Sequence, residues 1–209
     1  MAKALERRGI MDKNNQMGMM LNMPMIDVIE VIETRVLDFN KEFSFNYCDE
    51  VAYALDKLMK YDEIMETPKE ELTLRITISS PGGYVFALMK VMEKIELMKS
   101  KGYFIHTHVS NYAMSCGFIL YCTGNHKTMS PFATIMNHQA SSMSWGTVKE
   151  QEIRLENLKK EEELIQNYLR ENTRMSEEEI QKPYVTNTDI YYTAQESVDA
   201  GISDDIKLY

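Results

Sequence analysis

The sequence predicts an α/β fold, in which a mostly parallel sheet carries packed helices, and two observations lead to this fold class. Segments with the apolar period of strands alternate along the chain with segments that have the period of helices. This order is typical of parallel sheets, because each helix carries the crossover to the next strand. Of the 209 residues, 44% are apolar, which is enough for a sizeable core, and no Gly/Ser-rich or Pro-rich linker interrupts the chain. We therefore expect a flexible N-terminal segment over residues 1–25 and one domain over residues 26–209.

In the first half of this domain, the spacing of apolar residues separates strands from helices. Val51, Leu55 and Leu58 recur at helical spacing and define one face of a helix. The predicted elements are one or two strands within 26–45, a helix at 46–59, a turn or short helix start at 67–70, a strand at 72–79 and a helix at 84–99.

The second half continues this order and ends with capped helices. The predicted elements are an apolar helix that starts at Ser115, a strand at 133–138, a polar extended stretch at 140–146, a long helix from Thr147 to about Glu171, and short helices opened by capping boxes at Ser176 and Thr193. Asp189 falls in the loop or strand between the last two helices.

The long helix has an unusual apolar pattern. It opens with a capping box, in which the side chains of Thr147 and Glu150 each bond a free backbone N–H group. Its apolar residues form a thin stripe on an otherwise charged helix: Val148, Leu155, Leu158, Ile165 and Leu169. Such a stripe is typical of a helix that leaves the core to meet a partner helix, and the alternative is a solvated surface helix.

Charge and cysteine content restrict the possible partners and compartment. The net charge of −9, with Lys and Arg interleaved among acids, argues against a nucleic-acid partner. Cys48, Cys116 and Cys122 fit neither an even disulfide framework nor a metal-ligand spacing, which indicates a reducing compartment. The N-terminus lacks the cleavage site of a secretory signal, and no apolar run reaches membrane-spanning length. We expect a protein of the cytoplasm or of an organelle matrix or stroma, with no membrane partner.

Three short segments carry residues suited to acyl-transfer chemistry. Ser115 lies among small residues at a helix start, where free N–H groups can stabilise an oxyanion. Gly82 and Gly83 follow a β-rich run and let backbone N–H groups approach a carbonyl closely. His138 ends a short strand. Each signal is weak alone, because a serine at a helix start is usually an N-cap and Pro-Gly-Gly is usually only a turn. Together, a serine, a histidine and a later acid on successive strand ends form one order in which a catalytic triad assembles.

Four motifs in order resemble those of the proteolytic subunit of the Clp protease. They are Ser80-Pro81-Gly82-Gly83, Asn111-Tyr112-Ala113-Met114-Ser115-Cys116-Gly117, Met136-Asn137-His138-Gln139 and the segment from Asp189 to Ile202. The resemblance covers the chain from about residue 74 onward. It implies a ClpP/crotonase-like fold whose handle, a strand and a protruding long helix, lies at about 139–171.

The resemblance also implies a serine endopeptidase with a Ser-His-Asp triad. Ser115 would be the nucleophile, His138 the general base, and Asp189 the acid that orients the histidine. The backbone N–H groups of Gly83 and Cys116 match the family's oxyanion-hole positions. The positions expected to pair with the backbone of an extended substrate are Gly82, Gly83, Ser141 and Ser142.

The resemblance further implies a large assembly. Two heptameric rings would stack into a homo-tetradecamer, whose chamber receives unfolded polypeptides from a separate AAA+ unfoldase. ATP is used by that partner, so we expect no cofactor and no metal in this chain, which lacks a Walker-type Gly-x-x-x-x-Gly-Lys motif. In such an assembly the N-terminal segment lines an axial pore, and the handle helix interdigitates with the opposite ring.

The sequence departs from the family pattern at two informative positions. Ala140 follows Gln139 where the family usually has proline, which predicts a looser strand after His138. Thr188 stands where the family commonly has an arginine that pairs across the ring interface. The first 70 residues match poorly, and such divergence suits a phage- or organelle-type member.

Three other functions stay open at this point. A catalytically silent ring subunit would share the fold. A specialised protease, for instance one that matures viral heads, would share the same residues. An enzyme of the crotonase-like fold would act on acyl thioesters, but it would leave Ser115, His138 and Asp189 unexplained.

Overall fold

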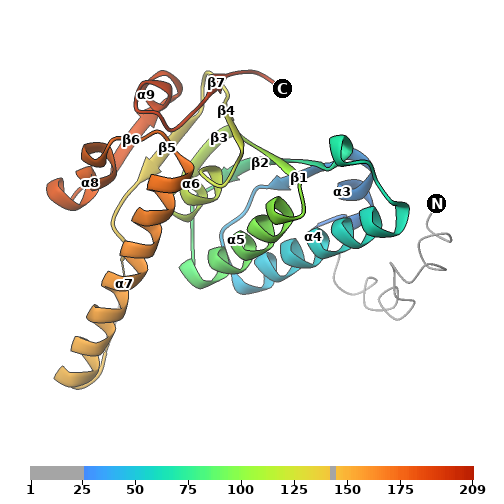
Figure 1. Cartoon of the computed structure of the whole chain (residues 1–209). Helices are drawn as coiled ribbons and strands as arrows, with labels where there is room; N and C mark the ends of the chain where they lie inside the picture. Colours follow the sequence, from blue (N-terminus) through green and yellow to red (C-terminus); the bar gives the residue numbers. More distant parts are fainter. Residues whose placement is uncertain (1–25, 142–144) are drawn as a thin grey trace.

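The computed structural model describes residues 26–141 and 145–209, and Figure 1 shows one sheet with helices packed against it. The strands are β1 (Val36–Phe39), β2 (Thr73–Ser80), β3 (Phe104–Met114), β4 (His126–Met129), β5 (Thr134–Asn137), β6 (Ile190–Thr193) and β7 (Asp205–Ile206). The helices are α3 (Val28–Thr34), α4 (Phe45–Met65), α5 (Val85–Ser100), α6 (Cys116–Tyr121), α7 (Val148–Asn172), α8 (Glu177–Thr186) and α9 (Ala194–Asp199), with a 3-10 turn, η1, at Lys69–Glu71.

The sheet is mainly parallel, so the predicted α/β class is confirmed. Its strand order is β1-β2-β3-β4-β7, with β5 attached to β3 and β6 attached to β5. Only the β5–β6 pair among these strands is antiparallel. The long strand β3 serves two neighbours in turn, because its residues 106–109 pair with β4 and its residues 112–114 pair with β5. The end of β3 therefore reaches beyond β4 to the part of the sheet that β5 and β6 complete.

The core lies between the sheet and α4 and α5, which run side by side in Figure 1. The face of α4 predicted from Val51, Leu55 and Leu58 is fully buried, as is every second side chain of β2. One continuous cluster of buried apolar residues extends from Ile26 to Ile202. This rigid body holds the ends of β2, β3 and β5 in fixed relative positions.

Residues 28–34 form helix α3, so the strand prediction for residues 26–45 is wrong there and correct only for β1. The run of β-branched residues suggested strands, but Asp27 caps the helix by accepting the N–H groups of Ile29 and Glu30. Val31 and Ile32 are buried, while Glu33 and Thr34 are exposed, which is a helical rather than an alternating pattern. Local capping and packing thus outweigh the β propensity of these residues.

Three strands, β3, β4 and the short β7, were not predicted from the apolar pattern. The middle of β3 contains the polar residues His106, Thr107 and His108, which interrupt the expected run of apolar side chains. Thr107 and His108 are buried nevertheless, and the Thr107 hydroxyl donates to the Tyr121 carbonyl at 2.7 Å. A polar side chain that satisfies its own hydrogen bonds inside the core carries no apolar signal.

Helix α7 begins with the predicted capping box, since Thr147 and Glu150 bond each other's backbone N–H groups. It projects away from the rest of the chain in Figure 1. Of the predicted stripe, Val148 is 75% and Leu155 is 53% exposed, whereas Leu169 is buried near the base of the helix. Within residues 26–141 and 145–209, the outer part of the stripe is therefore left uncovered.

Of the two other predicted capping boxes, one is complete and one is only half formed. The capping box at Thr193 is confirmed. Ser176 caps α8, but Glu179 bonds the side chains of Lys182 and Tyr192, so the predicted second half of that box is wrong. Residues 139–141 form no strand, although a strand of the handle was expected to begin there. The N-terminal segment, residues 1–25, and Ser142 lie outside the described residues. No helix in the described part of the chain is long and apolar enough to cross a membrane.

Candidate active site

Ser115 lies at the junction of β3 and α6 in a backbone conformation that is rare for a residue with a side chain. Its φ is 55° and its ψ is −119°, and its N–H donates to the Met136 carbonyl at 2.9 Å. Conformations of this kind cost on the order of 1–3 kcal/mol and persist only where the surroundings enforce them. The sharp turn from strand into helix presents the hydroxyl at the edge of the sheet, as in other turns that carry a nucleophile.

His138 reaches Ser115 because β5 lies parallel to the end of β3. Met114 pairs with Met136, so both chains leave the sheet at the same edge, with Ser115 and His138 just beyond it. The Nε2 atom of His138 lies 2.8 Å from the Oγ atom of Ser115, a hydrogen-bond distance.

Asp189 reaches His138 through the antiparallel pair. Asn137 of β5 faces Ile190 of β6, so the residue after Asn137 and the residue before Ile190 are neighbours. The Oδ1 atom of Asp189 lies 3.4 Å from the Nδ1 atom of His138, and the Asp189 side chain is 51% exposed. Ser115, His138 and Asp189 are far apart in the sequence, and strand pairing in the sheet places each next to the following one.

The Ser80–Gly83 turn is packed directly against Ser115. The Ser80 hydroxyl donates to the Lys41 carbonyl at 2.6 Å, and Phe43 N–H donates to the Gly82 carbonyl at 2.8 Å. Gly82 has a φ of +99°, and a Cβ atom there would lie 2.7 Å from the Ser115 Cβ atom. Gly83 has a φ of +143°, and a Cβ atom there would lie 2.7 Å from backbone atoms of Phe43. Both positions therefore require glycine.

Gly83 and Cys116 are in contact beside Ser115. In the described ranges, the N–H group of neither residue donates to a backbone carbonyl outside the helices and strands. The Cys116 thiol instead donates to the Gly83 carbonyl at 3.2 Å. Burial raises the pKa of this thiol to about 11, so it stays protonated at neutral pH and is no competitor of Ser115 as nucleophile.

A small pocket beside Ser115 and His138 contains residues that had no functional signal in the sequence. Its walls combine apolar and polar side chains: Val85, Ile119, Asn137, Glu162, Ile165 and Tyr184. They come from helices and a strand far apart in the chain, so no local motif joins them. Asn137 is 5% exposed, and its Nδ2 atom has no hydrogen-bond partner in the described residues.

The segment after His138 was expected to pair with substrate at Ser141 and Ser142. Ser141 is exposed, and Ser142 lies outside the described residues. Just before them, Gln139 donates to the carbonyls of Pro183 and Tyr184 at 3.5 and 3.3 Å, and Ala140 N–H donates to the Glu162 carboxylate at 3.1 Å. The loosening predicted from Ala140 is therefore opposed by contacts with α7 and α8.

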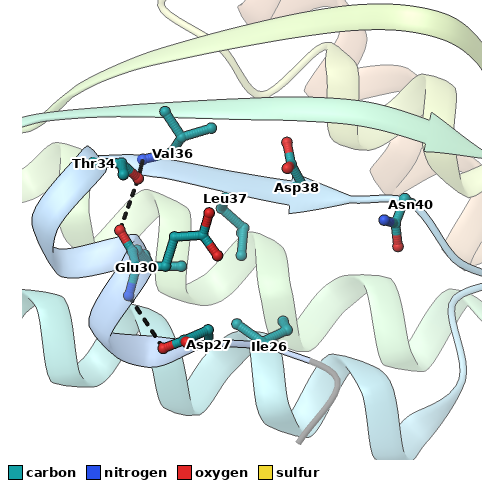
Figure 2. A pocket seen from close by; sticks show the side chains of 9 residues that line it. Ile26, Asp27, Glu30, Thr34, Val36, Leu37, Asp38 and Asn40 are labelled. Carbon is teal, nitrogen blue, oxygen red and sulfur yellow. Dashed lines mark hydrogen bonds between the residues drawn. The ribbon is translucent and has the colours of Figure 1, made fainter.

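Another pocket lies between α3 and β1, shown in Figure 2, and Ser115, His138 and Asp189 are not among the residues that line it. Asp27, Glu30 and Asp38 contribute carboxylates to it, but Asp27 is used as the cap of α3. Within residues 26–141 and 145–209, no group of three or more His, Cys, Asp or Glu side chains could hold a metal ion.

Comparison with known proteins gives a consistent result. The family described as Clp protease matches residues 28–208. The ATP-dependent Clp protease proteolytic subunit of Dehalococcoides mccartyi is 28% identical over 143 residues, which cover 68% of this chain and 68% of that protein. The ATP-dependent Clp protease proteolytic subunit 3 of Rhodococcus jostii is 32% identical over 139 residues, covering 66% of this chain and 65% of that protein.

Proposed function

This chain belongs to the Clp protease family, and we propose that it is a serine endopeptidase that hydrolyses extended or unfolded polypeptides. The proposal rests on one observation above all, the 2.8 Å contact between the Ser115 hydroxyl and His138 Nε2, continued by Asp189 at 3.4 Å on the other ring nitrogen. This is the order nucleophile, base and orienting acid that acyl transfer requires.

In the proposed mechanism, Ser115 Oγ attacks the carbonyl carbon of a peptide bond while His138 Nε2 takes the hydroxyl proton. The Asp189 carboxylate holds the Nδ1 proton and stabilises the imidazolium that forms. His138 then gives its proton to the leaving amine, which breaks the C–N bond and leaves an acyl-enzyme. A water molecule, deprotonated by His138, then attacks the carbonyl carbon of the acyl-enzyme. The ester bond to Ser115 breaks, the Ser115 oxygen takes the proton back from His138, and the new carboxyl end is released.

The N–H groups of Gly83 and Cys116 are the proposed donors to the oxyanion of each tetrahedral intermediate. A donor of this kind typically contributes on the order of a hundred- to a thousandfold in rate. Because both donors belong to the backbone, the Cys116 side chain is replaceable in this role. Gly82, Gly83, Ser141 and Ser142 are the proposed pairing positions for the substrate backbone.

We also propose the assembly that the resemblance implies, two stacked heptameric rings fed by an AAA+ unfoldase. The uncovered stripe of α7 supports a partner for that helix, because Val148 and Leu155 would otherwise expose apolar surface. ATP would act in the unfoldase and not in this chain, which therefore needs no cofactor. The three free, buried cysteines suit a reducing compartment such as the cytoplasm or an organelle matrix or stroma.

The deciding experiment is labelling with a fluorophosphonate serine probe, followed by peptide mapping and native mass spectrometry. We expect the wild-type chain to label at Ser115 within a large ring, and the Ser115→Ala variant to form the same ring without labelling. A ring of wild-type chains that stays unlabelled, alone and with an unfoldase, would indicate a silent subunit. A small unlabelled oligomer would rule out the proposed peptidase.

A further inference from the structure

The chain leaves the sheet directly before His138. Strand β5 ends at Asn137, and residues 138–141 belong to no strand. The imidazole of His138 therefore depends for its position on what holds the next residues. A displacement of about 1 Å at a catalytic group can reduce the rate on the order of a hundredfold.

Hydrogen bonds of two side chains, Gln139 and Glu162, tie this segment to helices α8 and α7. Gln139 reaches the carbonyls at the end of α8 with long contacts of 3.3 and 3.5 Å. Glu162, on α7, accepts the Ala140 N–H at 3.1 Å, which is the shorter of the links. A hydrogen bond to a charged group is worth more than a neutral one, so the Glu162 link is the stronger restraint.

This link exists only because residue 140 is not proline. Proline has no N–H group and fixes its own φ, so a chain with proline here is restrained without a partner. Alanine frees φ and supplies a donor, and Glu162 uses that donor. Alanine at position 140 thus lacks the fixed φ of a proline but gains the hydrogen bond to Glu162.

The surroundings of Glu162 suit this role. Glu162 lines the same pocket as Ser115 and His138. The Glu162 carboxylate forms no ion pair with a Lys or Arg of the described residues, and it accepts the Ala140 N–H. Burial raises the pKa of Glu162, while the bond from Ala140 N–H opposes this rise.

Glu162 also marks the place where α7 joins the body. Residues of α7 before Leu158 are exposed, and their side-chain hydrogen bonds in the described chain are confined to the local cap. From Glu162 onward, side chains of α7 bond other elements, as Tyr168 does to Glu96. The link to Ala140 is thus the first fixed point between α7 and the catalytic segment.

We propose that Glu162 is a positioning residue that holds the His138–Ser141 segment against α7 and so keeps His138 at Ser115, in place of the rigidity that a proline at position 140 would provide. This inference rests on the proposed function, because it concerns the rate of reaction at Ser115. Glu162 does not touch the reacting atoms, and its effect passes through the backbone of Ala140.

The test is a double-mutant cycle between residues 162 and 140, measured on the assembled protein. The rate constant of fluorophosphonate labelling at Ser115 reports the Ser115–His138 pair, and kcat and KM for a fluorogenic peptide report turnover. Glu162→Ala is expected to lower the labelling rate and kcat about tenfold, with a smaller change in KM. Glu162→Gln keeps an acceptor oxygen and is expected to stay within about threefold of wild type.

The decisive comparison is made in the Ala140→Pro background, where the donor is absent. There Glu162→Ala is expected to have no further effect, because the proline replaces the link it removes. Glu163→Ala is the matched control on the same helix, since Glu163 is exposed and does not line the pocket. Native mass spectrometry and thermal unfolding establish that each variant assembles.

The results separate the inference from the function on which it rests. Wild-type protein that neither labels at Ser115 nor cleaves the peptide overturns the proposed function, and the role of Glu162 falls with it. Active wild type with an equally active Glu162→Ala variant overturns the role of Glu162 alone. The same conclusion follows if Glu162→Ala lowers the rate equally with alanine and with proline at position 140. If the Glu162→Ala variant fails to assemble, the double variant Glu162→Ala/Ala140→Pro is measured in its place. A double variant that also fails to assemble contradicts the proposal.

Discussion

Gly82 and Ser115 lie so close that the space for any side chain at position 82 is already filled by the Ser115 side chain. The glycine turn and the proposed nucleophile therefore form one packed unit, although 32 positions separate them in the printed sequence. Gly102 offers a natural comparison, because it has a similar φ of +97° but no atom within 4 Å of its would-be Cβ.

Gly82→Ala is expected to abolish fluorophosphonate labelling at Ser115, with a loss on the order of a hundredfold or more, because the new methyl group displaces Ser115. Gly102→Ala should destabilise the chain by about 1 kcal/mol through its backbone conformation and leave labelling unchanged. Labelling rates and thermal unfolding measure the two effects separately. Equal labelling of the two variants would contradict the packing argument.

The strained backbone of Ser115 predicts an order of stability among inactive variants. Ser115→Gly relieves the positive φ, whereas Ser115→Ala keeps it. We expect the glycine variant to be more stable than the alanine variant by about 1 kcal/mol in urea unfolding. An alanine variant of equal or greater stability would show that Ser115 is not under backbone strain.

Asp189→Asn is expected to lower kcat on the order of a hundredfold, because an amide no longer favours the charged imidazole or its required tautomer. The loss should be smaller than in buried triads, since half of the Asp189 side chain is exposed. Peptide hydrolysis measures it, with the exposed Asp199→Asn as control. A kcat within about threefold of wild type would remove Asp189 from the mechanism.

Asp62 predicts how stability depends on pH. Burial alone raises the pKa of Asp62, but hydrogen bonds from Arg35, Tyr103 and Thr67 outweigh it and hold the pKa below its usual value. A lowered folded-state pKa means that stability is full above the unfolded value of about 3.9 and is lost as pH falls through the folded value.

Urea unfolding of wild type should therefore show a loss of stability below about pH 4 that Asp62→Asn reduces. At neutral pH the same variant should lose about 2–3 kcal/mol, because Arg35 keeps its charge without a partner. Asp49→Asn, which breaks the exposed pair with Lys90, is the control and should lose less than about 1 kcal/mol. Parallel pH profiles for wild type and Asp62→Asn would contradict this assignment.

The stripe of α7 predicts an effect on assembly alone. Leu155→Glu is expected to separate the proposed double ring into smaller assemblies, because a charge at a helix contact must be desolvated. Asn157→Glu adds the same charge to an exposed position outside the stripe and should leave the assembly intact. Native mass spectrometry distinguishes the two, and an unchanged large assembly in both variants would contradict a partner at this stripe.

Local patterns were sufficient for the parts of the site that depend on neighbours in sequence. Ser115 at a helix start, the glycine turn and the strand before His138 are short-range features, and each was predicted in place. Helix α3 was mistaken for a strand because capping by Asp27 outweighs the β-branched residues that follow it. The core of α4 was predicted because its apolar residues repeat at helical spacing.

The remaining parts of the site depend on contacts that no local pattern contains. Asp189 meets His138 through the antiparallel register of Asn137 and Ile190, which is a property of the sheet. Glu162 looked like one acid in a charged helix, and its contact with Ala140 appears only once the fold brings α7 beside the segment after His138. Strand β3 was not predicted for the same reason, because buried polar residues such as Thr107 have hydrogen-bond partners elsewhere in the chain.

The order of residues along the chain has a consequence for synthesis on the ribosome. Ser115 and His138 are translated well before Asp189, and β6 cannot pair with β5 until residues 190–193 have also emerged. An unfinished chain thus carries a serine and a histidine without the carboxylate that orients them. The pairing of β6 with β5 therefore delays completion of the proposed triad until residues 190–193 have been synthesised, so Ser115 and His138 lie without Asp189 beside them during the earlier part of folding.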